Sequence, residues 1–233
     1  MIVYNGIDIM SVAPVRIEDI HVSPIELSPV SRARAVNAGS VFVRNKFGVR
    51  TITISFAILT ENKIERQQAI EGLTAWAKMD KEYRMELPTE PNNYLECVCT
   101  GRPNPSTRQW WESRLQLVFT CFSNPFWTSK AEKSSACGVL FRVLGDAPPL
   151  MRIERTISGS AVSNQTYSNS IESMTFSTIP VGDMVIDLNK QTAAVGSTSI
   201  MEYYAPSGSF LIPRTGVHTI SGTGTVKWRE RWQ

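Results

Sequence analysis

The sequence has few of the residue types that catalytic and metal sites need. Its 233 residues contain four cysteines and two histidines, His21 and His218, which lie far apart. The cysteine and histidine spacing does not fit a zinc ligand set. A nucleophile elbow, a phosphate-binding glycine loop, an H-E-x-x-H helix and a dinucleotide fingerprint are all missing from the sequence. We therefore predict no enzyme activity, no metal and no cofactor.

Long apolar runs and a strong charge imbalance are missing as well. No window reaches the ~20 consecutive apolar residues that span a bilayer. The N-terminus shows no basic region followed by an apolar run, so we expect a soluble chain without Sec export and without a membrane partner. Lysine and arginine exceed aspartate and glutamate by 24 to 21, a net charge of +3. That balance gives no global argument for a nucleic-acid partner.

The four cysteines do not form the pattern of a disulfide-rich domain. Cys97 and Cys99 are two residues apart on a predicted strand and share a face with Leu95. Together with Cys121 and Cys137 they could pair in principle. For a chain without a signal peptide, however, reduced thiols in the core are the expectation.

The remaining composition is that of a folded protein. Hydrophobic residues make up 42% and charged residues 19% of the chain, which excludes general disorder. The length exceeds that of a common single domain, so two domains are expected.

Residues 50–100 carry the clearest secondary-structure pattern. Apolar residues alternate with polar ones from Ile52 to Ile58, which predicts a half-buried strand. Asn62 followed by Glu65 forms a capping box and predicts a helix over about 63–79. Its expected apolar stripe consists of Ile64, Ile70, Leu73, Trp76 and Ala77. A further strand is expected to end at Pro88.

The rest of the first half is predicted to be β. Asn5-Gly6 indicates a hairpin over residues 1–10. Pro24, Pro29 and several serines predict an irregular connection from about residue 24 to Gly39. We read Val41–Val43 and 47–58 as a hairpin joined at Asn45-Lys46. Residues 94–100 and 110–122 are expected to pair across a proline-containing loop.

The pattern changes at Asn124-Pro125-Phe126-Trp127, so we place a domain boundary there, with domains at 1–125 and 126–233. Beyond it no helix is expected. Short strands separated by turns predict a β-sandwich. Its expected strands cover 139–144, 151–158, 170–179, 184–188, 192–196, 201–203, 216–221 and 225–232.

Aromatic residues allow a second interpretation. Trp127, Tyr203 and Tyr204 could supply a stacking platform for a sugar in a lectin-like sandwich. Aromatic residues at such positions more often anchor a core or an interface. If the three rings do form such a platform, the alternative function is a carbohydrate-binding module that contacts a cell surface.

Several local features recur in an order that resembles a known family. They are a capped helix with Leu73-Thr74-Ala75-Trp76, the turn 87–91, the Asn-Pro-Phe-Trp segment at 124–127, and the segments 182–187, 209–213 and 226–232. In this order they resemble the distal tail protein of long-tailed bacteriophages, in its minimal form and over nearly the whole chain. The turn 213–218 departs from the family pattern, which usually has Pro-Gly and then Asn. That departure concerns the loop and leaves the fold unchanged.

The resemblance implies a fold, a function and a location. The fold would be mainly β with one amphipathic helix: an N-terminal α+β ring-forming domain followed by a galectin-like β-sandwich. The protein would form a hexameric ring that connects the tail tube protein to the tail-tip hub and the host-adsorption apparatus. It would be a virion protein assembled in the bacterial cytoplasm, and DNA would pass through its channel without specific binding.

Two stretches are candidates for the contacts of such a ring. They are residues 29–45 and the loop 100–110, because protruding hairpins and edge strands can extend a neighbour's sheet. The candidate interface residues in and beside these stretches are Arg32, Arg34, Arg44, Lys46, Arg102 and Arg108. The first four could also place positive charge near the DNA channel, although a solvated loop is an equally good interpretation.

Overall fold

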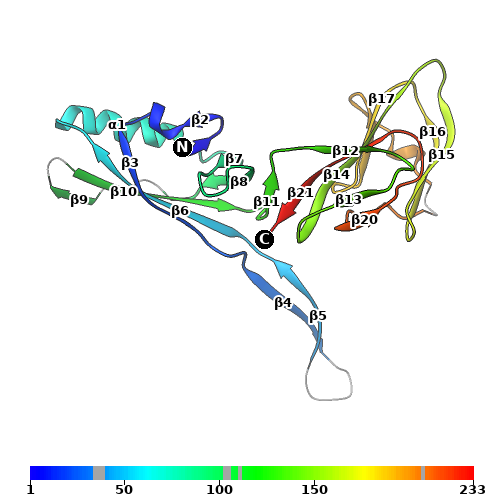
Figure 1. The fold of residues 1–233 in the computed structure, drawn as a ribbon, viewed down its shortest axis with the longest axis horizontal. Helices are drawn as coiled ribbons and strands as arrows, with labels where there is room; N and C mark the ends of the chain where they lie inside the picture. The colour runs from blue at the N-terminus through cyan, green and yellow to red at the C-terminus, as the bar shows by residue number, and fades with distance from the viewer. Residues whose placement is uncertain (34–39, 102–105, 110–111, 206–207) are drawn as a thin grey trace. The chain divides into compact units, whose positions relative to one another are not determined.

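The computed structural model describes residues 1–33, 40–101, 106–109, 112–205 and 208–233. The chain forms two compact units. The first comprises Met1–Trp127 and Gln233, and the second Thr128–Trp232 (Figure 1). No helix in the described part of the chain has the length and apolar character needed to cross a membrane.

The first unit is built on an antiparallel sheet. The strand β6 (Arg50–Leu59) lies between β3 (Val15–Val22) and β10 (Glu112–Cys121). The two ends of β10 pair with different strands, β9 (Ser106–Gln109) and β8 (Asn93–Cys99). Ile54 faces Leu117 on one side and Ile20 on the other, so alternate residues of the three strands point to the same face.

The alternating pattern predicted for residues 52–58 is confirmed. Ile52, Ile54, Phe56 and Ile58 are fully buried, while Thr51, Thr53 and Ser55 are half-buried on the other face. The segment expected to pair at 110–122 contains β10, and its alternate residues Leu115, Leu117, Phe119 and Cys121 are buried. The first two residues of that segment, Trp110 and Trp111, lie outside the described residues.

A smaller sheet and short turns close the first unit. The hairpin predicted at the N-terminus is present as β1 (Val3–Tyr4) and β2 (Ile7–Asp8) around Asn5-Gly6. Both turn residues have positive φ, 53° and 75°, as this turn requires. The 3₁₀ turn η1 (Ile9–Ser11) follows β2, and β7 (Tyr83–Glu86) joins β1 to β8.

The helix α1 (Lys63–Trp76) begins where the sequence predicts it and ends earlier. The Asn62 side chain accepts a hydrogen bond of 2.9 Å from the Glu65 N–H. The prediction of an end near residue 79 is wrong, because Ala77 leaves the helical conformation and the Lys78 carbonyl accepts hydrogen bonds from Tyr4 Oη and the Cys99 N–H. Ile64 was assigned to the buried stripe, but it is 72% exposed on the first turn.

One face of the sheet, the helix and the small sheet share a core. Tyr4 makes edge-on ring contacts with Trp76 and Phe119, at centroid distances of 5.4 and 5.1 Å. The Tyr4 hydroxyl donates to the carbonyls of Lys78 and Cys97. Burial therefore raises the pKa of Tyr4 far above its ordinary value.

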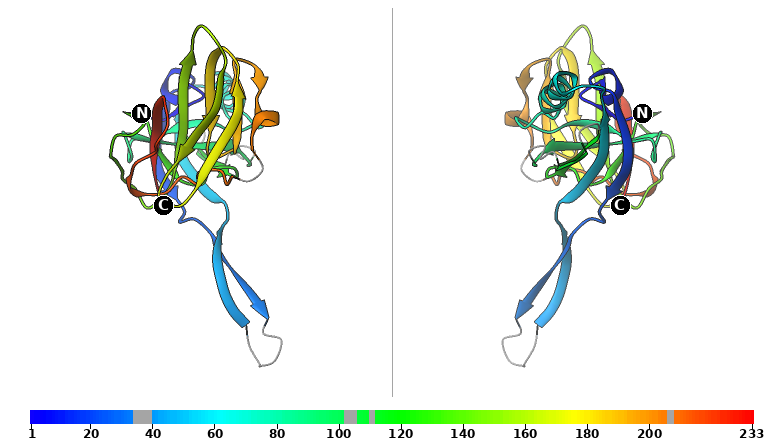
Figure 2. Two further views of the ribbon diagram at one scale, coloured as in Figure 1. Left: turned by 90° about the vertical axis from the view of Figure 1, so that its right-hand side faces the viewer. Right: turned by 90° about the vertical axis from the view of Figure 1, so that its left-hand side faces the viewer.

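A long hairpin extends from the first unit (Figures 1 and 2). It consists of β4 (Leu27–Ala33) and β5 (Ser40–Phe47), which pair only with each other among the described strands. Two predictions are wrong here: residues 27–33 are not irregular, and 40–47 pairs with β4 and not with β6. Pro29 is tolerated because both strands of a two-stranded ribbon are edge strands, where the missing N–H need not break a ladder.

The second unit consists of one larger sheet and two smaller ones. The larger sheet has the order β12 (Lys133–Ala136), β21 (Thr225–Trp232), β14 (Ala147–Ile157), β17 (Gly182–Asp187), β18 (Thr192–Val195) and β19 (Thr198–Ser199). β13 (Phe141–Val143) pairs with β20 (Gly216–His218), and β15 (Val162–Ser168) with β16 (Ser173–Ile179). The short strand β11 (Trp127–Ser129) lies at the junction of the units in the sequence.

Two details of the second unit were not predicted. The segment Met201–Tyr203, expected as a strand, is the 3₁₀ turn η2, in which the Tyr203 N–H donates to the Ile200 carbonyl. Strands β12 and β15 lie in polar stretches and were missed. Their alternation is weak because few of their residues are buried, so periodicity could not reveal them.

The cysteines agree with the prediction of reduced thiols. All four are free; Cys97, Cys99 and Cys121 are buried, and Cys137 is half-buried. Burial raises the pKa of the Cys97, Cys99 and Cys137 thiols, so these three thiols stay protonated and unreactive at neutral pH.

Candidate subunit interface

The long hairpin brings three of the six predicted interface residues together. Arg32 lies on β4, and Arg44 and Lys46 lie on β5. The strands are in register at Ser28–Lys46, Val30–Arg44 and Arg32–Val41, with a bulge in β5 between the last two pairs. Residues 28, 30 and 32 occupy one face of β4, so the register places positions 32, 44 and 46 on the same face of the hairpin.

The hairpin also exposes apolar residues near its base. Leu27 is 51% exposed and Phe47, its cross-strand partner, is 39% exposed. Phe47 contacts Phe126 at a centroid distance of 5.0 Å, and Gly48 donates a hydrogen bond to the Glu26 carbonyl. A Cβ on Gly48 would lie 3.0 Å from Glu26 Cβ, so the close approach at the base favours glycine. The base is thus fixed to the first unit.

Of the other three predicted interface residues, the structure describes one. Arg108 is on β9, an edge strand of the main sheet, whereas Arg34 and Arg102 lie outside the described residues. Among the described strands, β9 pairs only with β10 and β3 pairs only with β6. The sheet therefore has open edges on opposite sides. The sequence did not predict these edges, because they depend on which distant strands pair with each other.

The residues of the sugar-binding alternative are not gathered in one unit. Trp127 belongs to the first unit, is half-buried against its core, and has the Arg50 guanidinium 5.9 Å from its ring centroid. Tyr203 and Tyr204 pack against the core of the second unit, where Tyr204 contacts Phe176 and Phe210. Rings held in this way serve as core anchors. Sugar binding stays a prediction.

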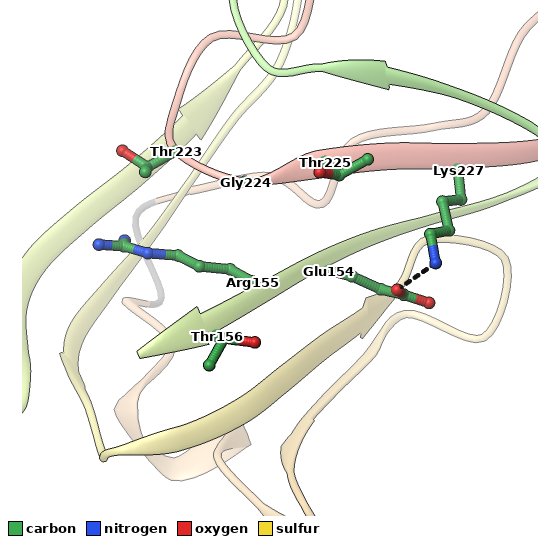
Figure 3. Close-up of a pocket in the computed structure, with 7 residues that line it drawn as sticks. All are labelled: Glu154, Arg155, Thr156, Thr223, Gly224, Thr225 and Lys227. Atoms are coloured by element: carbon green, nitrogen blue, oxygen red, sulfur yellow. Dashed lines mark ion pairs between the residues drawn. The ribbon is translucent and has the colours of Figure 1, made fainter. Parts of the chain in front are cut away.

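A polar hollow of about 490 Å³ lies on the second unit (Figure 3). Glu154 on β14 and Lys227 on β21 form an ion pair of 2.7 Å across it, and Arg152 bonds the same carboxylate. These partners, Lys227 first, hold the pKa of Glu154 below its ordinary value. The Arg155 guanidinium donates to Gln165. Because the charged groups already have partners and no aromatic residue lines the hollow, it lacks a stacking platform.

Comparison with solved structures decides the fold. Over 100% of this chain and 98% of the other, the structure superposes on the crystal structure of the SPP1 Dit protein, with a TM-score of 0.79 and 12% sequence identity. The chain has the fold of a phage distal tail protein. The resemblance stated from the sequence is thereby confirmed, and so is the mainly β fold with one helix.

Two further structures are similar to the distal tail fold seen here. They are the phage P2 baseplate in its activated conformation with calcium and with strontium, at TM-scores of 0.49 and 0.47 and identities of 10% and 11%. The first match covers 97% of this chain and 92% of the other, and the second 94% and 91%. No protein-family model and no curated protein matches the sequence.

Proposed function

We propose that the protein is a structural component of a phage tail tip or baseplate. It forms a hexameric ring that connects the distal end of the tail tube to the tail-tip hub and the host-adsorption apparatus. Residues 1–125 form the ring, and residues 126–233 form a galectin-like β-sandwich attached to it. The protein is part of the virion and assembles in the bacterial cytoplasm.

The observation that carries this proposal is the likeness to the SPP1 Dit protein over the full length of both chains. That protein is described as a paradigm of the hub adsorption apparatus in phages infecting Gram-positive bacteria. At 12% sequence identity, this likeness supports the same fold but does not show that any particular residue contact is shared. The ring must therefore be supported by the surfaces of this chain.

The open edges of the main sheet support a ring. β3 and β9 lie on opposite sides of the same sheet, so an edge of one copy can meet the opposite edge of the next. Such a head-to-tail contact closes into six copies when each is rotated by about 60° from its neighbour. Arg108 on β9 lies at one of these edges.

The face of the sheet turned away from the core suits a channel that DNA passes without specific binding. It carries Thr53 and Ser55 from β6 and the exposed Gln116 from β10. Arg114 on this face is paired with Glu18 at 3.4 Å. Small hydroxyl groups and an arginine paired with a carboxylate attract DNA phosphates only weakly.

The proposal is tested by the oligomeric state of the purified full-length chain. Light scattering coupled to size-exclusion chromatography, at several concentrations, should give six chains, and negative-stain images should show a ring with a central hole. Because the tail tube can act as a template, the same imaging is repeated with tube protein added. A monomer at every concentration that also forms no ring on the tube would overturn the proposal.

A further inference from the structure

Two cysteines of the first unit lie opposite each other on adjacent strands. The antiparallel register of β8 and β10 pairs Cys99 with Phe119. Two residues further along the same register, Cys97 faces Cys121, the last residue of β10. Both side chains are fully buried, and both belong to the core beneath the sheet.

The hydrogen bonds around these strands identify the type of this pair. The Thr100 N–H donates to the Val118 carbonyl on β10, whereas the Cys99 N–H donates to a carbonyl outside β10. Hydrogen-bonded and non-hydrogen-bonded pairs alternate along an antiparallel ladder, so Cys97 and Cys121 form a non-hydrogen-bonded pair. The Cα atoms of such a pair are about 4.5 Å apart, within the range of about 4.4–6.8 Å that a disulfide spans.

The two thiols also contact each other. The Cys97 and Cys121 side chains are hydrogen bonded, and the Cys97 sulfur is 3.9 Å from the sulfur of Met85. Burial first, and then the bond to Cys121, raises the pKa of the Cys97 thiol. Because disulfide exchange needs a thiolate, the closed fold keeps this pair as two thiols until the strands open locally.

The remaining pairings of the three core cysteines have unsuitable geometry. Cys97 and Cys99 point the same way from β8, so their Cβ atoms are about 6.6 Å apart, against about 3.5–4.5 Å in a disulfide. Cys99 and Cys121 are diagonal neighbours, about 7–8 Å apart. The Cys99 thiol donates instead to the Gly101 carbonyl at 3.2 Å. The arrangement therefore favours one pair.

The end of β10 gives an oxidant a route to Cys121. The next residue, Phe122, is 57% exposed, and the N–H groups of Phe122 and Ser123 donate to the Glu82 carboxylate. Opening a strand end breaks few hydrogen bonds, so it occurs far more often than global unfolding. Cys121 is therefore the first of the two thiols to react.

We infer that Cys97 and Cys121 form a cross-strand disulfide when the chain meets a small-molecule disulfide as the oxidant. The Cys121 thiolate attacks one sulfur of the oxidant and releases one small thiol. The Cys97 thiolate then attacks the Cys121 sulfur, which forms the bond and releases the second small thiol. The chain loses two electrons and two protons, and the oxidant is reduced to two thiols. The bond joins β8 to β10.

This inference goes beyond the proposed function, because the bond lies within one copy of the chain. Only its timing rests on that function. A virion protein assembles in the reducing cytoplasm and meets oxidising surroundings after release, so the bond forms in the assembled particle.

A thiol–disulfide equilibrium in the full-length chain tests the inference. The test chain carries Cys99→Ser and Cys137→Ala, which leaves Cys97 and Cys121. It is equilibrated with reduced and oxidised β-mercaptoethanol at about pH 8.5, near the ordinary pKa of cysteine, both without urea and unfolded in urea. Intact mass after acid quenching measures the bond. Its equilibrium constant should be at least about tenfold higher in the folded chain. Burial slows the exchange without changing this constant.

A matched control separates native geometry from chain connectivity. It keeps Cys99 and Cys121 and carries Cys97→Ala and Cys137→Ala. Its loop is only slightly shorter, so the two unfolded chains should form their bonds about equally well. Folding should favour the bond in the test chain alone. Equal constants for the two folded chains, or a constant that folding lowers in the test chain, would overturn the inference.

The unsubstituted chain gives a second readout. Oxidation should leave two of its four cysteines open to alkylation and raise the urea midpoint of unfolding, and reduction should reverse both changes. A midpoint that falls on oxidation would contradict the inference. Ring formation is measured separately under reducing conditions, so failure of the disulfide leaves the proposed ring standing, and failure of the ring leaves the disulfide standing.

Discussion

Both units have an apolar core with aromatic residues, and the second unit adds two buried carboxylates. In the first, the interior is apolar and aromatic: Tyr4, Trp76 and Phe119 meet in edge-on contacts beneath the sheet. In the second, two buried glutamates join segments far apart in sequence. Glu230 is 4% exposed and accepts hydrogen bonds from Lys133 Nζ and the Leu144 N–H, at 2.7 and 2.9 Å.

The other buried glutamate of the second unit has a similar role. Glu172 is 8% exposed and accepts from the Ile212 N–H at 2.9 Å, from Asn169 and from Arg214. It thereby ties the turn before β16 to the segment before β20. Apolar burial barely depends on pH, whereas buried carboxylates stabilise only while they are ionised. The comparison predicts that the second unit is more sensitive to acid than the first.

The largest expected effect is in the aromatic core of the first unit. Phe119→Ala should cost about 3–5 kcal/mol of the free energy of unfolding, because it removes a fully buried ring and leaves a cavity. Urea denaturation followed by peptide-resolved hydrogen exchange measures the loss. Phe122→Ala, at a 57% exposed position, is the control and should change it by about 0.5 kcal/mol or less. Equal loss of protection in both units would contradict the separation of their cores.

A smaller effect is expected from Glu230 in the second unit. Glu230→Ala should cost about 2–3 kcal/mol, because the Leu144 N–H loses its charged acceptor and Lys133 loses its partner. Lys133 is 43% exposed, so water compensates part of its loss. Hydrogen exchange should increase mainly in peptides from β12, β13 and β21. Glu202→Ala, at an exposed position, is the control, and a comparable cost there would remove the special role of Glu230.

Much of the fold could be predicted wherever local chemistry decides it. The alternation at residues 52–58 and the cap at Asn62 each act within a few residues, and both predictions are confirmed. The β4–β5 hairpin could not be predicted, since Leu27 pairs with Phe47 and Pro29 looks like a breaker until its edge position is known. The segment at 201–203 is too short for periodicity to separate a strand from a 3₁₀ turn.

The candidate interface was only partly visible in the sequence. The sequence shows directly that residues 27–47 contain basic residues and no acidic residue. The register of the hairpin then places Arg32, Arg44 and Lys46 on one face. The hollow beside the start of α1 could not be predicted from the sequence, because Val12 and Pro14 come from one segment and Thr60 and Glu65 from a distant one. Only the fold shows that Glu61 and Glu65, at the start of α1, lie beside the apolar residues Val12, Pro14 and Leu59.

The last and smallest effect sharpens the difference in acid sensitivity. Burial raises the pKa of Glu172, but hydrogen bonds from the Ile212 N–H and Asn169 and the charge of Arg214 lower it more, so its net pKa lies below the ordinary value of 4.5. Because the folded-state pKa is depressed, the stabilisation is complete above about pH 4.5 and disappears as the pH falls through the lower, folded-state value.

Glu172→Gln should therefore cost about 1–2 kcal/mol at pH 7 and progressively less as the pH falls below 4.5. Hydrogen exchange at pH 7 and at successively lower pH compares peptides around residues 169–172 and 209–214 with those of the first unit. In the original chain the second unit should lose protection first on acidification, once the intrinsic pH dependence of exchange is corrected. If Glu172→Gln lowered the free energy of unfolding by the same amount at every pH, packing of the side chain and not its ionisation would make Glu172 important. The acid sensitivity of the second unit would then depend on Glu154 and its cationic partners.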